Sequence, residues 1–331
     1  MTTYRELGAV GAGTYGTVSK CLDMTNGQVV AVKKLRNTMN GRRGASYHRY
    51  CEMMVREICL LRALNDDHVV SMIETFRHNG HVHMVFPLMR YNLYRHLELN
   101  GGSLTVDDTK ECIYQVLKGL NYIHGQNVVH RDIKPENILL SANGVIKICD
   151  FGVSRMFCSD RTLDLSIEMG TVWYQAPEML MESTKYDATV DIWSVGILIT
   201  ELISKMPLVA EDTIISQLYG ITKILGSDNC DLTVVDEYLR KHGFSLNLEA
   251  NHAPLSQSYI VSKTAMALRK VYAWWPGYLM EIITYCLQFN PNNRKNAAQL
   301  LEMKFFTAGT FLLRFNKELK IMLDNDNARY Q

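Results

Sequence analysis

The sequence lacks a charge excess and a long apolar run, and each absence excludes a class of protein. Its 331 residues carry 35 Lys and Arg against 34 Asp and Glu, a formal net charge of +1. No broad electrostatic attraction to nucleic acid or to an acidic membrane surface follows from that balance. The longest apolar run, residues 192–203, is interrupted by Glu201 and is too short to span a bilayer. We therefore expect a buried helix there, and neither a nucleic-acid nor a membrane partner.

Paired cysteines are also lacking, because the eight cysteines are scattered without a C-x-x-C spacing. This pattern predicts free thiols in a reducing compartment rather than a disulfide framework. The first residues, MTTYRELG, lack the apolar core of a secretion signal. We therefore expect a cytoplasmic or nuclear protein.

With 47% apolar and 21% charged residues the composition is that of an ordinary globular chain, and the length suggests about two domains.

The stretch HRDIKPEN, residues 130–137, combines several chemically active side chains. Asp132 is followed two positions later by Lys134, which sets a carboxylate beside a cation. Pro135 prevents a helix from starting at this point, and Asn137 supplies a neutral oxygen. The stretch therefore predicts a loop in which one acid, one cation and one amide lie close together.

The next residues predict a hairpin that returns a second acid to this loop. Residues 138–140 and 145–149 read as short apolar strands, and residues 141–144 between them carry a turn signal. Asp150 follows directly after the second strand. A hairpin that brings Asn137 and Asp150 back beside another carboxylate predicts a divalent-cation site with a base next to it. Oxygen ligands of this type suit magnesium, which completes its shell with water and phosphate oxygens.

A glycine-rich stretch near the N-terminus, GAGTYGTV at residues 11–18, lies between two strand patterns. Its glycines allow backbone N–H groups to approach a polyphosphate without interference from Cβ atoms. A single GxGxxG fits a dinucleotide-binding turn or a plain hairpin equally well, but the dinucleotide-binding fold requires a helix directly afterwards. Here a third strand, VVAVKKL, follows and carries Lys33.

A helix is predicted over EMMVREICLLRAL, residues 52–64, because Met54, Ile58, Leu61 and Leu64 fall on one face. The polar and basic residues 37–50 before it are expected to form a mobile loop.

HRDIKPEN followed by the DFG of residues 150–152, together with the glycine loop and the strand lysine, resembles the protein kinases. The resemblance covers residues 4 to about 306 and is to the group that contains the cyclin-dependent and MAP kinases. It implies an α+β fold of two lobes joined near residue 90. The smaller, β-rich N-lobe with one main helix is assigned to residues 1–88, the larger and mostly helical C-lobe to residues 89–306, and a tail to residues 307–331.

The resemblance also implies that the cofactors are ATP and Mg²⁺, and it gives each motif residue a role. The catalytic positions are Asp132, Lys134, Lys33, Glu57 and Thr171. The metal ligands are Asn137 and Asp150. The residues that contact the nucleotide are Gly11, Gly13, Gly16, Val18, Ala31, Lys33, Phe86, Pro87, Met89 and Leu139. Three further residues are structural by the same resemblance: Asp191 holds the HRD backbone, and Glu178 pairs with Arg294.

Regulation by phosphate is a further implication of the resemblance. The expected phosphorylation sites are Thr14, Tyr15 and Ser166. The arginines expected to receive the activating phosphate are Arg56, Arg131 and Arg155. Three converging guanidinium groups repel one another until a phosphate of charge about −1.5 to −2 draws them together.

Several features favour a divergent cyclin-dependent kinase within this group. Thr14 and Tyr15 in the glycine loop resemble that family, and Glu168 stands where a MAP kinase has tyrosine. The expected partners are protein substrates, an upstream activating kinase and a cyclin-like activator at residues 51–58, where CEMMVRE replaces PSTAIRE. The substrate pocket departs from the family at Gly170 and Gln175, although a preference for proline after the target residue is still expected.

The predicted function is therefore a serine/threonine kinase of the cell-cycle type. Two alternatives stay open. One is a MAP-kinase-like enzyme that needs no cyclin, and the other is a pseudokinase scaffold, whose usual mark is loss of the lysine or of a catalytic aspartate. Neither loss occurs in this sequence.

Overall fold

The computed structural model describes residues 3–13, 16–36, 45–156, 171–183, 186–225, 232–246 and 256–328. The chain divides into two compact units. The first unit comprises Met1–Leu93, Glu136–Val153 and Asn316–Gln331, and the second comprises Tyr94–Pro135 and Ser154–Phe315. Two segments distant in the sequence thus join the N-terminal residues, a grouping that differs from the contiguous lobes expected above. The lobe boundaries themselves stay a prediction.

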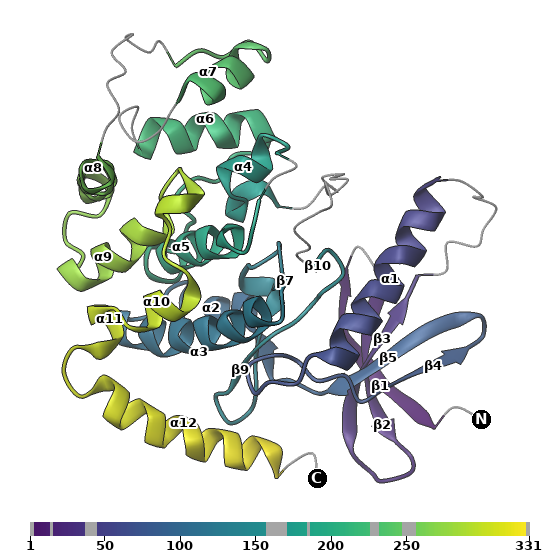
Figure 1. The fold of residues 1–331 in the computed structure, drawn as a ribbon. Helices are drawn as coiled ribbons and strands as arrows, with labels where there is room; N and C mark the ends of the chain where they lie inside the picture. Colours follow the sequence, from purple (N-terminus) through teal and green to yellow (C-terminus); the bar gives the residue numbers. More distant parts are fainter. Residues whose placement is uncertain are drawn as a thin grey trace. The chain divides into compact units, whose positions relative to one another are not determined.

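The first unit contains an antiparallel sheet of five strands (Figure 1). The strands follow the order β1-β2-β3-β5-β4, with bounds β1 Tyr4–Gly13, β2 Gly16–Asp23, β3 Val29–Leu35, β4 Glu74–His78 and β5 His81–Pro87. Alternation along β3 buries Val30 and Val32 with Cys21 and Val85 in a small core. The alternating side chains of Ala31 and Lys33 face the other side of the sheet.

The helix of the first unit, α1, runs over Ala45–Ala63. The predicted helix is therefore confirmed, but the expectation of a loop up to residue 50 was wrong for residues 45–50. From residue 45 to residue 63 the sequence contains no glycine or proline, so its polar and basic beginning does not interrupt the helix. Residues 37–44 lie outside the described part of the chain.

A second sheet of the first unit contains the predicted hairpin. Strands β8 (Ile138–Leu140) and β9 (Ile146–Ile148) pair antiparallel, and β6 (Tyr91–Asn92) joins β8 on its other edge. The turn closes through the Ser141 N–H, which donates to the Val145 carbonyl over 2.8 Å. Gly144 has a φ of 89° there, a conformation that glycine adopts without strain.

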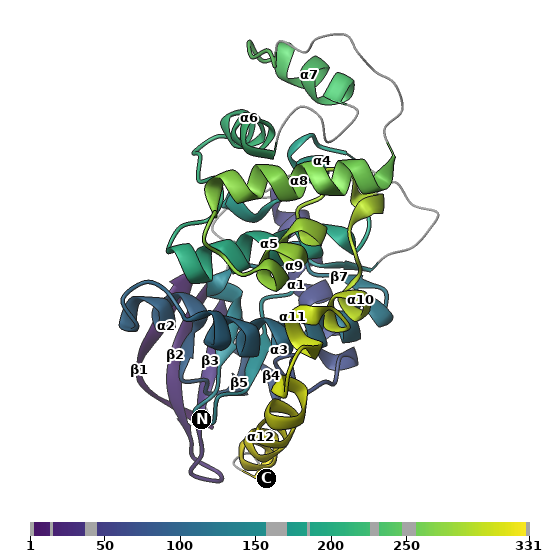
Figure 2. The same ribbon diagram turned by 90° about the vertical axis from the view of Figure 1, so that its left-hand side faces the viewer.

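The second unit is mostly helical (Figure 2). Its longest helices are α3 (Val106–Gly125), α5 (Thr189–Ser204) and α8 (Gln257–Val271). The remaining helices are α2 (Leu93–Leu99, its first residue in the first unit), α4 (Pro177–Leu180), α6 (Ile214–Leu225), α7 (Leu232–Arg240), α9 (Gly277–Cys286), α10 (Ala297–Leu301) and α11 (Lys304–Thr307), and the strands are β7 (Val128–Val129) and β10 (Arg155–Met156). Helix α5 packs against both α3 and α9 and is buried along most of its length, as the apolar run predicts. The α+β architecture is therefore confirmed.

The last helix, α12 (Phe311–Asn327), belongs to both units, because its residues up to Phe315 are part of the second and the rest part of the first. Phe311 and Phe315 pack edge-on against Tyr114. Further along, buried Asp326 lies 3.7 Å from the Lys147 ammonium. Among the described residues, no helix is both long and apolar enough to cross a membrane.

We expect Gly196 in α5 to tolerate no side chain. A Cβ added there would stand 2.7 Å from Cβ of Cys286, the last residue of α9, and 2.7 Å from Cδ2 of Leu287, which follows it. Ala normally stabilises a helix by about 1 kcal/mol relative to Gly, but overpacking should reverse the sign and lower the unfolding free energy of Gly196→Ala by about 1–3 kcal/mol. Urea unfolding measures this. Gly125→Ala in α3, where no atom lies within 4 Å, is the control that should lose nothing; equal stability of the two variants would contradict the packing argument.

Candidate active site

Lys33 forms the centre of a charged cluster in the first unit. Strand β3 directs its side chain toward α1, where the ammonium lies 2.6 Å from Glu57 Oε1. A second carboxylate, Asp150 Oδ1, lies 3.3 Å from the same nitrogen. The Lys33 and Glu57 side chains are only 14% and 4% exposed, so neither charge is strongly screened by water. The predicted pairing of Lys33 with Glu57 is therefore observed.

The two carboxylates determine the charge state of Lys33. Burial alone would lower the pKa of the Lys33 ammonium, but Glu57 and Asp150 outweigh burial and raise that pKa above its ordinary value. Lys33 is therefore a stable cation. Burial raises the pKa of Glu57, and the charge of Lys33 opposes that shift. One cation facing two carboxylates leaves this cluster with a net negative charge when all three groups are ionised.

Asn137 and Asp150 are brought together by the register of the hairpin. Ile138 pairs with Ile148, and just beyond them the Cys149 N–H donates to the Asn137 carbonyl over 2.9 Å. Asp150 follows with a φ of 64°, a left-handed conformation that is uncommon for a residue other than glycine. Phe151 beside it is completely buried and anchors the turn. The backbone therefore sets the predicted metal ligands on neighbouring positions of the two strand ends.

The donor set fits magnesium in a restricted sense. Among the described residues, no group of three or more His, Cys, Asp or Glu side chains could hold a metal by itself. The amide of Asn137 and the carboxylate of Asp150 suit a cation that takes its remaining ligands from water and phosphate oxygens. The Glu57 carboxylate contacts the same Lys33 ammonium as Asp150. Asn137 and Asp150 would hold such an ion only together with a phosphorylated ligand.

The residues predicted to contact the adenine base lie on the two sheets of the first unit. Val18 pairs with Lys33 across β2 and β3, and Ala31 pairs with Phe86 across β3 and β5. The whole predicted set is half-buried, namely Val18, Ala31, Phe86, Pro87, Met89 and Leu139. Apolar side chains that the core of the unit does not fully cover are available to a planar apolar ligand.

Gly16 and Gly11 of the glycine-rich loop have different surroundings. A Cβ on Gly16 would stand 2.2 Å from the Lys34 carbonyl oxygen, whereas a Cβ on Gly11 would meet nothing within 4 Å. Gly16 is therefore required by the close approach of β2 to β3, and Gly11 leaves open space. Thr14 and Tyr15 lie outside the described residues, as do Ser166, Glu168 and Gly170.

In the second unit, Asp191 of α5 holds the HRD segment. Its carboxylate is fully buried and accepts from the backbone N–H groups of His130 and Arg131 over 2.9 and 2.7 Å. His124 Nε2 lies 2.8 Å from the same carboxylate. Burial tends to raise the pKa of Asp191, but the hydrogen bond and charge of His124 and the backbone donor of Arg131 lower it below its ordinary value. The carboxylate is therefore ionised and fixes the backbone in front of Asp132.

Asp132 and Lys134, the predicted catalytic residues of the second unit, come directly after His130 and Arg131 in the sequence. The Lys134 ammonium lies 2.8 Å from Asp132 Oδ2, so the acid and the cation of the motif are in contact. The Asp132 N–H donates to His130 Nδ1 over 3.3 Å, a bond within the HRD segment. Thr171 lies at the start of the 3₁₀ turn Val172–Tyr174; its predicted role stays a prediction.

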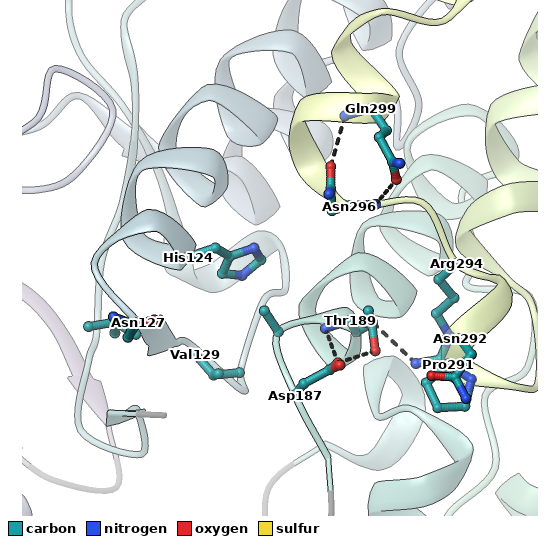
Figure 3. A pocket seen from close by; sticks show the side chains of 12 residues that line it. His124, Asn127, Val129, Asp187, Thr189, Pro291, Asn292, Arg294, Asn296 and Gln299 are labelled. Carbon is teal, nitrogen blue, oxygen red and sulfur yellow. Dashed lines mark hydrogen bonds between the residues drawn. The ribbon is translucent and has the colours of Figure 1, made fainter. Parts of the chain in front are cut away.

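A cavity of about 350 Å³ lies beside these supports in the second unit, and Figure 3 shows the side chains around it. His124, Thr189 and Arg294 line it. The Arg294 guanidinium makes two bonds to Glu178, of 2.6 and 2.8 Å, and is fully buried. It also donates to the Thr189 carbonyl at the start of α5 over 3.1 Å. The predicted pair of Glu178 and Arg294 is therefore observed, and it ties α4 to α5.

The predicted phosphate-receiving arginines divide between the units. Arg56 belongs to the first, whereas Arg131 and Arg155 belong to the second. Arg131 has a φ of 73° and lies over the ring of Tyr186, with 5.8 Å from Cζ to the ring centroid. Sequence reasoning missed both Tyr186 and His124. No local pattern reveals them, because His124 lies 67 positions from the carboxylate it contacts.

Comparison with known proteins agrees with this geometry. The protein kinase domain matches residues 4–306, so the chain belongs to the protein kinase domain family. Cyclin-dependent kinase-like 2 of Homo sapiens is 31% identical over 326 residues, which covers 98% of this chain and 62% of that relative. Cyclin-dependent kinase-like 4 of Mus musculus is 33% identical over 311 residues, with 92% and 84% covered.

These relatives support a divergent member similar to the cyclin-dependent-kinase-like proteins. The chain spans less than two thirds of the length of the first of them, at 62%. Membership of the family implies, in general terms, the use of ATP, a divalent metal and protein substrates.

We expect Asp191→Asn to cost about 3 kcal/mol of unfolding free energy at neutral pH, because removing one partner of a buried charged network leaves the others unsatisfied. The folded pKa of Asp191 lies below the ordinary value of 3.8. The stability that the carboxylate contributes is thus fully present above about that pH and is lost as the pH falls through the lower folded pKa. The difference between wild type and variant, measured by denaturant unfolding, should shrink below pH 4.

Asp187→Asn provides the matched control at the start of the same helix, because Asp187 is exposed, accepts from the Thr189 N–H, and Asn caps equally well. It should change stability by less than about 0.5 kcal/mol. A loss for Asp191→Asn that is the same at every pH would show that the ionised carboxylate is not the source of the stability.

Proposed function

We propose that the protein is an active serine/threonine kinase that transfers the γ-phosphoryl group of ATP to protein substrates. The observation that carries this proposal is the cluster of Lys33, Glu57 and Asp150. A buried cation held by one carboxylate and shared with a second, at the end of a hairpin that also positions Asn137, is the arrangement required to bind a metal-complexed triphosphate. The choice of serine and threonine rests on Lys134 and Thr171, by resemblance alone.

Each predicted active-site residue would have its own role in phosphoryl transfer. Lys33, fixed by Glu57, binds the α- and β-phosphates, and Asn137 and Asp150 bind Mg²⁺. Asp132 orients the substrate hydroxyl and accepts its proton, and Lys134 stabilises the charge on the transferred group. The ATP–magnesium complex supplies the phosphoryl group and a polarised leaving group. Because the transition state is loose, positioning and charge neutralisation provide most of the acceleration.

The half-buried side chains of Val18, Ala31 and Phe86 on the five-stranded sheet, and of Leu139 on the smaller sheet, support binding of the adenine base. Pro87 stands where many family members carry glutamate. Hydrogen bonding there requires only a backbone carbonyl from residue 87, which proline retains, and an N–H donor, which Met89 can supply. The replacement is therefore compatible with nucleotide binding.

Phosphoryl transfer to a protein substrate, measured with radiolabelled ATP, should fall at least about 100-fold in Asp132→Asn and in Lys33→Met. Lys34→Met is the control, because Lys34 is the exposed neighbour of Lys33 on β3, and it should retain activity within about twofold. Chelation of divalent cations should abolish the signal in every case. Equal signal from wild type and both active-site variants would end the kinase proposal. Nucleotide binding without transfer under all conditions would favour the pseudokinase alternative.

Activation through a cyclin-like partner at residues 51–58 is the form of regulation we favour. Glu52, Val55 and Cys59 follow one another at helical spacing on α1 and are exposed, Val55 at 60%. Glu57 is on the opposite, buried side of the helix. A partner on this exposed face would act on the orientation of Glu57, and so on Lys33. The alternative is a MAP-kinase-like enzyme that an upstream kinase activates alone.

Val55→Asp should abolish co-purification of the activating protein from native cells and reduce kinase activity, because a charge would be buried in the interface. Met24→Asp changes an equally exposed apolar residue, at 56%, in a turn of the same unit and should preserve both. Full activity of the Val55→Asp monomer after phosphorylation of Ser166 would favour the MAP-kinase-like alternative.

A further inference from the structure

Helices α8 and α9 pack side by side and leave a groove between them (Figure 2). The chain reverses direction between the two helices, so Arg269 near the end of α8 lies beside Gly277 at the start of α9. A Cβ added to Gly277 would stand 3.7 Å from Arg269 Nη2. A cavity of about 630 Å³ lies along the pair, which is within the size range of ligand pockets in proteins. These two helices of the second unit therefore border a ligand-sized space that the proposed function does not use.

Small side chains keep this groove open. Helix α8 is buried at Thr264 and Leu268, whereas Ser258, Ser262 and Ala265 line the cavity. The three lining residues follow one another at helical spacing and so lie on one face of α8. Because their side chains contain only one or two heavy atoms, they fill little of the space between the helices.

Three charged side chains line the groove, and their signs alternate along it. Arg269 lies at the end where α9 begins. Glu281 lies one helical turn further along α9. Lys295 lies near the other end, where its ammonium is 4.5 Å from the centroid of the Tyr285 ring, a further turn along the helix. The groove therefore presents its charges in the order positive, negative, positive.

These charges are available to a ligand. Arg269 donates from Nη1 to the Trp275 carbonyl over 2.8 Å, which orients its guanidinium group and leaves Nη2 on the side of Gly277. Among the residues that the structure describes, Arg269, Glu281 and Lys295 form no ion pair with one another or with any other side chain. A ligand with the opposite order of charges would therefore be attracted at three points without breaking an ion pair of the protein.

The spacing of the charges favours an extended peptide. One turn of a helix advances about 5.4 Å along its axis, and alternate side chains of an extended chain are about 6.6–6.8 Å apart on the same face. An extended segment with the pattern acidic–x–basic–x–acidic would thus keep its charges in step with Arg269, Glu281 and Lys295. A polymer of uniform negative charge, such as nucleic acid, would be repelled by Glu281.

We propose that the groove between α8 and α9 is a docking site for an extended segment of a partner protein with the pattern acidic–x–basic–x–acidic. Glu281 binds the central cation of the segment, and Arg269 and Lys295 bind the two flanking carboxylates. The inference goes beyond the proposed kinase function and does not depend on it, because none of these three residues belongs to the predicted active site. Recognition rests on the order of charges in partly exposed pairs, so binding should weaken as salt is added.

The test titrates the full chain, without nucleotide, into the fluorescein-labelled peptide Glu-Ala-Lys-Ala-Glu at low ionic strength and records fluorescence anisotropy. We expect saturable binding that is about tenfold tighter than that of the inverted peptide Lys-Ala-Glu-Ala-Lys. Glu281→Lys should bind the first peptide about tenfold more weakly than wild type and should bind Glu-Ala-Glu-Ala-Glu about tenfold more tightly, because the central charge has changed sign. The gain of binding cannot arise from misfolding of the variant.

Glu302→Lys is the matched charge control. Glu302 is exposed at the end of α10 in the same unit and is not among the described residues that line the groove, so this variant should keep the preference of wild type. Ser262→Trp should abolish binding by filling the groove. Met266→Trp is its control, because Met266 lies on the same helix, is 59% exposed and is likewise not among the lining residues described.

Three results would overturn the proposal. They are the absence of saturable binding by wild type, equal affinity of wild type for the peptide and its inverted form, and an unchanged preference in Glu281→Lys. No kinase activity is measured in this experiment. An inactive protein that binds the peptide as described would refute the proposed function alone, and an active kinase that does not bind it would refute only this inference.

Discussion

The buried carboxylate of Asp191 is the constraint on which the second unit depends. An isolated charge in a protein interior is very costly, and here two backbone N–H groups and His124 offset that cost. The bonds of Asp191 to the two backbone N–H groups have two consequences for the HRD segment. It helps hold Arg131 in a left-handed conformation, and it orients the chain so that Asp132 contacts Lys134. A carboxylate 60 positions from Arg131 in the sequence thus fixes the backbone from which the Arg131 and Asp132 side chains project.

The first unit is organised on a different electrostatic principle. Its buried cation, Lys33, faces two carboxylates rather than one, so the cluster is not neutral by itself. Glu57 is almost fully buried, whereas the Asp150 side chain is 31% exposed. The inner carboxylate therefore acts as a fixed partner, whereas the outer one is partly reached by solvent. This asymmetry explains physically why a metal ion is expected on the Asp150 side, next to Asn137, and not beside Glu57.

The local parts of this structure follow from the residues themselves, whereas distant contacts such as that of Glu178 with Arg294 were predicted only through the family resemblance. The hairpin of residues 138–148 and the metal-ligand positions at its ends follow from apolar runs and a turn signal a few residues long. The beginning of α1 was missed because the basic residues before position 51 look like a loop, although the stretch without glycine or proline already indicates a longer helix. The contacts of His124 with Asp191 and of Arg131 with Tyr186 join segments more than fifty positions apart. Only packing determines them, and no spacing in the sequence encodes them.

The buried charges of the second unit differ in how completely they are paired. Glu178 and Arg294 satisfy one another in a two-pronged pair, and Asp191 has its full set of partners. Arg131 is the contrasting case, because the bond that stabilises its backbone also aims its guanidinium at a place where the described residues supply no acceptor. The buried carboxylate that is itself paired therefore leaves its neighbour in the HRD segment with guanidinium donors that no described residue satisfies.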